Sequence, residues 1–386
     1  MDRKLRILGI VPNSGGCSFY RCIQPLKLME RELGDKVEIR FTENPLQFDE
    51  ATKSAPPNDQ LVDLNWCDVA WMSNIQKYGG NYTARTAQVV KELGKFLHFD
   101  TDDLLTELYE DHKLFGVYKD NKLDEVTKFV YNISDLVTVT QNKFAMRIQP
   151  FVGKVMAVVK NTLDYSLPCW NVPRVPSKRC RIGWAAGIHH IPDVKVFESV
   201  PHLINQKCGR ENIAWHFLGH PPPDPNKPKG WEDSVWPEYR ARLLNAFKGQ
   251  PNYSIFYALP PDAYGGYFAN MDVSIAPLQM NAFNDSKSDI KVAEASRYKI
   301  PLVASNVGCY NETIQNGKTG YLIEPDAPKT EWVRILSKLV KDPKHRVELG
   351  NNLHEATKDL FDGAKNAKER YNLYLRAFQD TGYQPK

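Results

Sequence analysis

The chain has 386 residues, of which 42% are hydrophobic and 25% are charged, and its formal net charge is +4. These values are typical of a soluble globular protein of about two to three domains, and the charge is too small to indicate nucleic-acid binding by itself. Residues 1–165 contain 21 basic and 23 acidic side chains, so the basic excess lies in the remainder of the chain. A basic C-terminal part fits a small polyanionic ligand such as a diphosphate better than a DNA-coating surface.

Seven cysteines are scattered through the chain without the spacing of a metal site. An odd count without a signal sequence predicts reduced thiols and a cytoplasmic protein. The first apolar run, Leu5–Val11, is too short for a signal sequence and is typical of a buried strand. No apolar run approaches the roughly 20 residues that span a bilayer, which leaves only peripheral contact with a membrane open.

Short apolar runs alternate with helical stretches through the first part of the chain. The runs expected to be strands are Leu5–Val11, Val37–Phe41, Val69–Met72, Phe96–Phe99 and Leu136–Thr140. Helices are expected at Tyr20–Leu33 and Tyr82–Leu93, among others. This alternation predicts an α/β unit with a parallel sheet and helices on both faces.

A second series of the same kind follows a segment rich in proline and polar residues, PCWNVPRVPSK. Its expected strands are Arg181–Ala185, Ile213–Leu218, Tyr253–Tyr257, Val273–Pro277 and Pro301–Ala304. The sequence therefore predicts one domain at residues 1–167, a linker at 168–178 and a second domain at 179–362. Residues 363–386 are expected to form a C-terminal helix that packs back on the first domain.

The segment 283–310 concentrates charge at the start of an expected helix. Lys287 and Lys291 are four residues apart, so we expect them on one helical face with Glu294 on roughly the same side. Two lysines near a helix N-terminus can hold a pyrophosphate and stabilise it as it leaves. Glu294 can accept hydrogen bonds from ribose hydroxyls. The alternative is a solvated amphipathic helix with both lysines in water.

Two glycines, Gly15 and Gly16, follow the first expected strand and precede a helix, and Arg21 lies near that helix start. Glycines let backbone N–H groups approach a phosphate or a sugar closely, although an ordinary strand–helix turn has the same pattern.

Three carboxylates, Asp100, Asp102 and Asp103, fall within four positions at the end of another expected strand. Such a cluster is costly unless it is solvated or paired, which indicates a cleft. Three interpretations stay open. The carboxylates contact sugar or acceptor hydroxyls, or they hold a divalent metal ion, or Asp102 is a helix N-cap with Asp103 in the first turn.

Residues 286–305, SKSDIKVAEASRYKIPLVAS, and 307–323, VGCYNETIQNGKTGYLI, resemble the donor-site signature of GT-B glycosyltransferases, most closely the large retaining family 4. They share with it a lysine, an acidic residue on the next helix, an Ile-Pro strand, a glutamate and an Asn-Gly turn. RIGWAAGIHHIPD, at 181–193, resembles the first strand and phosphate-facing loop of the family's nucleotide domain. The resemblance is strong over about 180–325 and weaker over 5–165.

The resemblance implies an α/β GT-B fold, with two Rossmann-like domains facing a central cleft. It implies a hexosyl- or pentosyltransferase that retains anomeric configuration. The C-terminal domain would bind a nucleotide-diphosphate sugar, a UDP-sugar before a GDP-sugar, and the N-terminal domain would offer a hydroxyl acceptor. No metal and no permanently bound cofactor are expected. Lys287 and Lys291 would stabilise the charge that develops on the diphosphate.

Carried over residue by residue, the resemblance assigns a set of donor-binding residues. They are Gly15, Gly16, Arg21, Gly187, His189, His190, Tyr257, Leu259, Ser286 and Glu294. Asp100 and Asp102 would stand in for a histidine that the family usually has, and they join the two lysines as candidate catalytic residues. The chain departs from the family at Ser286, where the first of two glutamates is usual, and at His189 and His190, where an arginine is usual.

Several alternatives remain at this level. Tyr257 and Leu259 either border the nucleotide base or belong to the core, and each histidine is either a phosphate ligand or structural. The acceptor is a glycan or lipid-linked glycan, or a hydroxymethylated base of phage DNA. A non-catalytic module that binds nucleotide sugars is the alternative from another class, since Ser286 replaces a glutamate.

Overall fold

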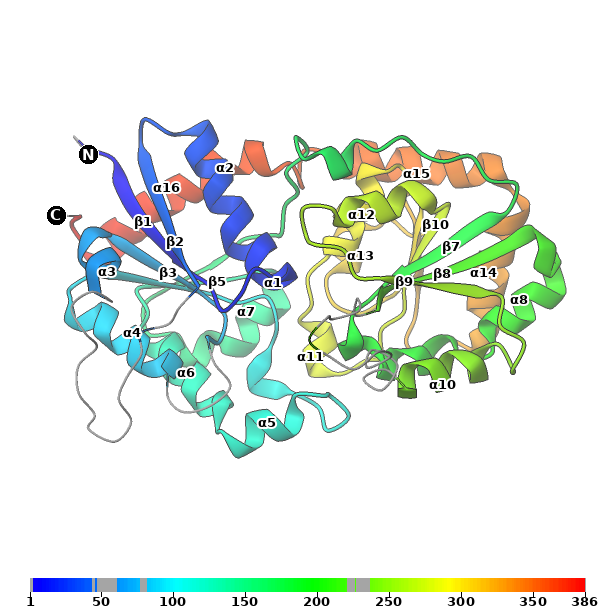
Figure 1. Ribbon diagram of the computed structural model, residues 1–386, viewed down its shortest axis with the longest axis horizontal. Coiled ribbons are helices and arrows are strands. Elements are labelled where there is room, and N and C mark those ends of the chain that lie inside the picture. Colours follow the sequence, from blue (N-terminus) through cyan, green and yellow to red (C-terminus); the bar gives the residue numbers. More distant parts are fainter. Residues whose placement is uncertain are drawn as a thin grey trace. The chain divides into compact units, whose positions relative to one another are not determined.

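The computed structural model describes residues 3–43, 46, 61–76, 82–220, 226 and 237–385. By its contacts the chain divides into two units, each built around its own sheet (Figure 1). Unit 1 comprises Met1–Tyr165, Ser286–Ser288 and Phe361–Lys386, and unit 2 comprises Ser166–Asp285 and Asp289–Leu360.

The sheet of unit 1 has six parallel strands in the order β2-β1-β3-β4-β5-β6. The strands are β1 (Leu5–Ile10), β2 (Val37–Thr42), β3 (Val69–Ser73), β4 (Phe96–Asp100), β5 (Leu136–Val139) and β6 (Val155–Val158). Every residue of β3, β4 and β5 is buried, because helices cover both faces of a parallel sheet.

The helices of unit 1 pack on both faces of this sheet. They are α1 (Gly16–Ser18), α2 (Gln24–Glu32), α3 (Val62–Trp66), α4 (Tyr82–Glu92), α5 (Phe115–Asp120), α6 (Leu123–Ile133), α7 (Asn142–Ile148) and α16 (Gly363–Thr381). Figure 1 shows α2 and α16 on one face, and α4 and α6 on the other. Although α16 follows the whole of unit 2 in the sequence, its Tyr374 and Phe378 pack in one apolar core with Trp71 and Phe96.

Unit 2 repeats the architecture with the strand order β12-β11-β10-β7-β8-β9, again all parallel. The strands are β7 (Cys180–Ala185), β8 (Ile213–His220), β9 (Tyr253–Tyr257), β10 (Val273–Ala276), β11 (Leu302–Ser305) and β12 (Tyr321–Ile323). Its helices are α8 (Val200–Cys208), α10 (Pro237–Ala246), α11 (Ala282–Asp285), α12 (Ile290–Arg297), α13 (Tyr310–Thr313), α14 (Lys329–Lys341) and α15 (Pro343–Thr357). Every residue of β7, β10 and β11 is buried, whereas the edge strand β9 is half-buried or exposed along its length.

The strands expected from the sequence are confirmed to within a residue or two, and β6 and β12, both at sheet edges, were not expected. The helix expected at Tyr20–Leu33 begins earlier, at Gly16, and contains a π-helical segment at Phe19–Ile23 before α2. No helix among the described residues has the length and apolar character needed to cross a membrane.

A glycine fixes how closely α15 approaches the end of α12. A Cβ atom added at Gly350 would lie 2.0 Å from the carbonyl oxygen of Lys299, far inside contact distance. Only a residue without a side chain therefore permits this packing.

We expect Gly350→Ala to lower the free energy of unfolding by about 1–3 kcal/mol, because the backbone at Lys299 must move. The matched control is Gly116→Ala in α5, where a Cβ atom would meet no heavy atom within 4 Å. Alanine there should raise stability by about 0.5–1 kcal/mol. Thermal unfolding followed by circular dichroism measures both, and equal melting temperatures for the two variants would contradict this account of the packing.

Candidate functional site

The carboxyl ends of β7 and β10, which are neighbours in the sheet of unit 2, lead into segments that hold several predicted donor-side residues. Ligands of open parallel sheets bind at this edge, because loops and helix starts gather there. The described side chains of these loops are tied together by buried polar contacts.

Lys291 lies in the first turn of α12. The helix begins at Ile290, and the carbonyl oxygen of Asp289 accepts the first hydrogen bond from Val292 N at 2.9 Å. The Lys291 ammonium donates to Glu294 Oε2 at 2.8 Å and to the Tyr264 hydroxyl at 3.0 Å. Two of its three N–H groups are thus engaged, and the third can donate to a bound anion.

The surroundings keep this charge in place. Glu294 is only 1% exposed, and burial raises the pKa of its carboxyl while the Lys291 charge opposes that rise. Burial, followed by the Glu294 charge, raises the pKa of Tyr264 well above its ordinary value, so its hydroxyl stays neutral. A fixed ammonium, held by one carboxylate and one hydroxyl, is suited to stabilising negative charge at the helix start.

Lys287 does not share the helical face of Lys291, so that prediction is wrong. The helix begins only at Ile290, and Lys287 lies in the preceding segment, Ser286–Ser288, which groups with unit 1. The Lys287 ammonium lies 3.3 Å from Asp103 Oδ1 in the same unit. Spacing of four residues makes neighbours only within a continuous helix, and here the backbone is not helical. Ser286 itself is fully buried.

Asp193, fully buried, holds two of the loops together. Its Oδ1 accepts from the backbone N of Gln279 at 2.8 Å and from Asn284 Nδ2 at 3.1 Å, and its Oδ2 lies 2.8 Å from His190 Nδ1. Because Nδ1 of His190 faces the carboxylate, this contact fixes the orientation of the imidazole ring. The sequence interpretation missed both Asp193 and Tyr264 as site residues.

The remaining donor-side predictions concern the loop after β7 and the end of strand β9. His189 is half-buried beside His190, and a Cβ atom added at Gly187 would meet no heavy atom within 4 Å. Tyr257 and Leu259, at and after the end of edge strand β9, are 50% and 40% exposed. The alternative that they are core residues is therefore wrong, and contact with a base stays a prediction.

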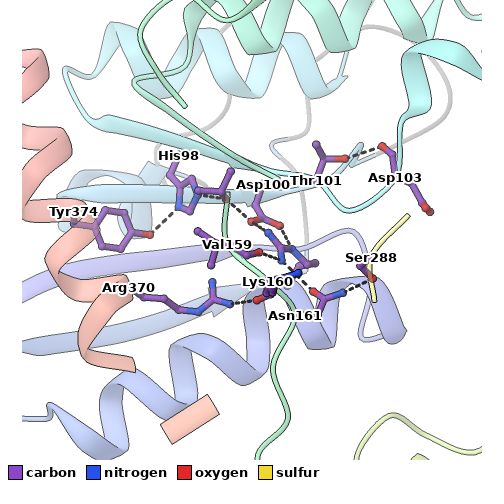
Figure 2. A network of polar contacts seen from close by, with 12 residues as sticks. His98, Asp100, Thr101, Asp103, Val159, Lys160, Asn161, Ser288, Arg370 and Tyr374 are labelled. Carbon is purple, nitrogen blue, oxygen red and sulfur yellow. Dashed lines mark hydrogen bonds and ion pairs between the residues drawn. The ribbon is translucent and has the colours of Figure 1, made fainter. Parts of the chain in front are cut away.

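In unit 1, Arg21 and Asp100 form a buried bidentate ion pair. Figure 2 labels Asp100 and several residues around the pair, among them Val159 and Asn161. Arg21 Nε and Nη2 donate to the two carboxylate oxygens at 2.7 and 2.6 Å, and both side chains are at most 1% exposed. Nη1 donates to the carbonyl of Val159 at 2.7 Å and to Asn161 Oδ1 at 3.0 Å. Burial would lower the pKa of Arg21, but the Asp100 charge and hydrogen bonds outweigh it and raise that pKa.

The pair continues into a chain of hydrogen bonds that ends on α16. Thr138 donates its only hydroxyl proton to Asp100, so it must accept from His98 Nε2, 2.7 Å away. The unprotonated Nδ1 then accepts from the Tyr374 hydroxyl at 2.8 Å. Burial lowers the pKa of His98 to about 3, which keeps this histidine neutral. At the other end, Asn161 Nδ2 donates to Ser288 Oγ at 3.0 Å (Figure 2).

These contacts occupy the side chains of Arg21 and Asp100. The sequence had assigned Arg21 to contact with the nucleotide-sugar donor and Asp100 to contact with sugar or acceptor hydroxyls. Since each satisfies the other, the geometry favours a role in positioning the carboxyl edge of the sheet. Gly15 and Gly16 lie at that edge, where Gly15 N donates to Asn13 Oδ1 at 2.8 Å. A Cβ atom at Gly16 would meet no heavy atom within 4 Å, so a ligand can approach this turn. The π-helical segment that carries Arg21 is of a kind frequent at functional sites.

Asp102 is not a helix N-cap, so that interpretation is wrong. The next helical turn, at Leu105–Glu107, has Leu104 in the cap position. Asp102 Oδ1 is buried and has no hydrogen-bond partner among the described residues. Burial, with the charge of Asp103, raises the pKa of Asp102 to about 7.

The thiol of Cys17 joins the two carboxylates of Asp102 and Asp103, with one donor atom of each within 4.8 Å of the others. By distance alone this cluster could hold a metal ion. The Asp102 charge, followed by burial, raises the pKa of Cys17 well above its ordinary value, so the thiol is protonated when no cation is bound. Metal-independence stays a prediction.

We expect Arg21→Met to lower the free energy of unfolding by about 3–5 kcal/mol, because it leaves Asp100 buried and unpaired. Adding Asp100→Asn should restore part of that loss in a double-mutant cycle. Arg242→Met, which breaks the exposed pair with Glu238, is the control and should cost less than about 1 kcal/mol. Unchanged stability of Arg21→Met together with weaker nucleotide binding would instead support direct ligand contact.

The raised pKa of Asp102 predicts a pH dependence of stability. Between about pH 4 and 7 the folded state keeps the proton that the unfolded state releases, so stability should fall as pH rises and then level off. Asp102→Asn should flatten this fall and raise the melting temperature at pH 8 by at least about 2 °C, the shift given by ~1 kcal/mol. The exposed Asp120→Asn is the control. A wild-type pH profile in Asp102→Asn would contradict the assignment.

Part of the chain matches a known protein family. Residues 240–356, which include Lys291 and Glu294, match the family model of glycosyl transferases group 1. A segment of 113 residues is 25% identical to the capsular polysaccharide biosynthesis glycosyltransferase CapM of Staphylococcus aureus. That match covers 28% of this chain and 28% of CapM.

Solved structures extend the likeness to the whole fold. Sucrose-phosphate synthase from Thermosynechococcus elongatus aligns with a TM-score of 0.66 at 12% identity, over 97% of this chain and 100% of that one. Anabaena HepE, in complex with UDP and glucose, aligns with a TM-score of 0.64 at 14% identity, over 96% of this chain and 100% of that one. The α/β fold of two Rossmann-like domains expected from the sequence is thereby confirmed. The chain has the GT-B fold, and its residues 240–356 match the model of glycosyl transferases group 1.

Proposed function

We propose that the protein transfers a sugar from a nucleotide-diphosphate sugar to a hydroxyl acceptor, with retention of anomeric configuration. The observation that carries the proposal is the ammonium of Lys291, fixed by Glu294 and Tyr264 at the start of α12. This arrangement lies within the segment that matches the glycosyltransferase family model.

Lys291 would stabilise the negative charge that develops on the diphosphate as the bond to the sugar breaks. Interactions that strengthen as charge develops accelerate the reaction, and a single such donor is typically worth about 10²–10³ in rate. Glu294 would accept hydrogen bonds from the ribose hydroxyls with the oxygen that Lys291 leaves available. His190, held at Nδ1 by Asp193, would donate from Nε2 to a phosphate oxygen in its doubly protonated, imidazolium form.

Retention fits the composition of the site. The acceptor oxygen bonds to the anomeric carbon on the face from which the diphosphate leaves, and the acceptor proton passes to a diphosphate oxygen. No protein base is needed for this transfer. Lys287 would add a second positive charge, and Asp102 would contact the acceptor or the sugar, while Ser286 replaces the glutamate usual in family 4.

A UDP-sugar is the donor we propose, with a GDP-sugar as the alternative. Support comes from HepE, whose solved structures contain UDP with glucose and UDP-glucose. A glycan acceptor is supported by CapM, named for capsular polysaccharide biosynthesis, and by S. aureus TarM, solved with α-GlcNAc-glycerol. The DNA acceptor has no comparable support, and the cytoplasmic location remains a prediction.

The test begins with the donor site. UDP should raise the melting temperature of the wild type more than GDP, ADP or dTDP, and Lys291→Ala should lose most of that stabilisation. In hydrolysis or transfer of the matching sugar, Lys291→Ala should lower kcat by about 10²–10³. The control is Lys341→Ala, an exposed lysine in the last turn of α14, which should leave both measurements unchanged.

The outcomes separate the classes of function. Nucleotide binding without transfer to any acceptor, and without slow hydrolysis of the donor sugar, would favour the non-catalytic module. No stabilisation of the folded protein by any nucleotide would refute the donor site. Inversion of the anomeric centre, read by proton NMR of the product, would refute retention while leaving glycosyl transfer intact.

A further inference from the structure

A pocket opens at the amino edge of the sheet of unit 2, the edge opposite to the candidate donor site. Its volume is about 270 Å³, and it is lined by Arg174, Val175, Pro176, Ser177, Arg181 and Asp272. Arg181 lies in β7, Asp272 directly precedes β10, and the others belong to the segment that leads into β7. None of these residues takes part in the site described above.

The pocket carries more positive than negative charge. Asp272 accepts from Arg181 Nε at 2.9 Å and from Arg174 Nη2 at 2.7 Å, so two guanidinium groups share one carboxylate. The third guanidinium nearby, that of Arg346 in α15, is close enough to lower the pKa of Arg174. One full positive charge on the pocket wall is thus left without a compensating carboxylate in the lining.

Donor groups remain available on this wall. Arg174 Nε and Nη1 and Arg181 Nη1 have no hydrogen-bond partner among the described residues. Arg181 is held rigidly, with its side chain 8% exposed, while that of Arg174 is 38% exposed at the rim. The Ser177 hydroxyl, whose oxygen accepts from Arg179 N at 3.1 Å, can donate its proton into the same space.

Burial is the first cause that lowers the pKa of Arg174, the Asp272 charge opposes it, and the charges of Arg181 and Arg346 lower it further. The charged form of Arg174 is therefore less stable here than it would be in water. A bound anion would offset that loss of stability, since it adds the missing negative charge and accepts from the remaining N–H groups.

From this geometry we infer a second ligand site, in which Arg174, Arg181 and Ser177 bind a phosphate group. Guanidinium groups match phosphate because their planar forks present parallel N–H donors to two of its oxygens. The volume lies just below the roughly 300–1,000 Å³ of pockets for drug-sized ligands, so it suits one phosphate with few further atoms. Free phosphate and the phosphate of a small monoester share this chemistry.

The experiment is calorimetric titration of the full chain with inorganic phosphate and, separately, with glycerol 3-phosphate, at ionic strength held constant with sodium chloride. We expect saturable binding of at least one probe in the wild type. Arg174→Gln should weaken it by about tenfold or more, the effect of losing a charge-assisted contact worth ~1.4 kcal/mol. Tighter binding of the monoester would identify an organic phosphate, and binding of inorganic phosphate alone would identify free phosphate.

Two control variants make the test specific. Arg179→Gln removes the same charge from an exposed neighbour outside the pocket lining and should bind as the wild type does. Lys291→Ala should also bind phosphate normally, because the donor site lies at the other edge of the sheet. Binding of UDP by Arg174→Gln checks that this variant folds.

Several results would overturn the inference. One is the absence of saturable binding of either probe at concentrations up to about 10 mM, since a millimolar site has a binding free energy of ~4 kcal/mol. Another is that Arg174→Gln binds phosphate with the affinity of the wild type. A third is that Arg179→Gln loses as much phosphate affinity as Arg174→Gln. Loss of phosphate binding in Lys291→Ala would place the phosphate in the donor site instead. Because UDP binding is measured separately, failure of this second site is distinguishable from failure of the proposed glycosyl transfer.

Discussion

The buried pair of Arg21 and Asp100 is the constraint on which the carboxyl edge of unit 1 depends. Two charges at most 1% exposed are tolerated only if they face each other and their remaining donors and acceptors are satisfied. Thr138, Val159 and Asn161 supply those contacts. The π-helical segment, β4 and the chain beyond β6 are therefore held in one arrangement. This arrangement also fixes where the loops that follow these elements begin.

Unit 2 uses the same physical means at its own carboxyl edge. Asp193 and Glu294 are buried carboxylates. Asp193 accepts hydrogen bonds from Gln279 and Asn284, which are distant in the sequence. Glu294 accepts a hydrogen bond from Lys291, one turn earlier in its own helix. Asp193 cannot change position without losing its contacts to Gln279, Asn284 and His190, and Glu294 cannot do so without losing Lys291. Lys291 is consequently fixed before any ligand arrives, which is what electrostatic stabilisation of a transition state requires.

The sequence was sufficient for features with a local signal and insufficient for those that depend on distant partners. Apolar runs of four to seven residues marked the strands, and the spaced motif around Lys291 and Glu294 marked part of the segment that matches the family model. The pairing of Arg21 with Asp100 joins residues 79 positions apart, so no local pattern reveals it. Helical spacing also misplaced Lys287, because side-chain identity alone did not show that the helix begins at Ile290. Asp193 lies within the segment that resembles the family's phosphate-facing loop, but the sequence alone did not show that its side chain joins two loops.

The position of α16 has a consequence for how the protein is made. Its residues complete the apolar core of unit 1, yet they are synthesised only after the whole of unit 2. At typical rates of about 5–20 residues per second, the first sheet waits roughly 10–40 s for its last helix. During that interval the second unit can finish its own core while the apolar face around Trp71 and Phe96 is still uncovered. Translation speed and chaperone supply, rather than the stability of the finished fold, would then limit the yield of active protein.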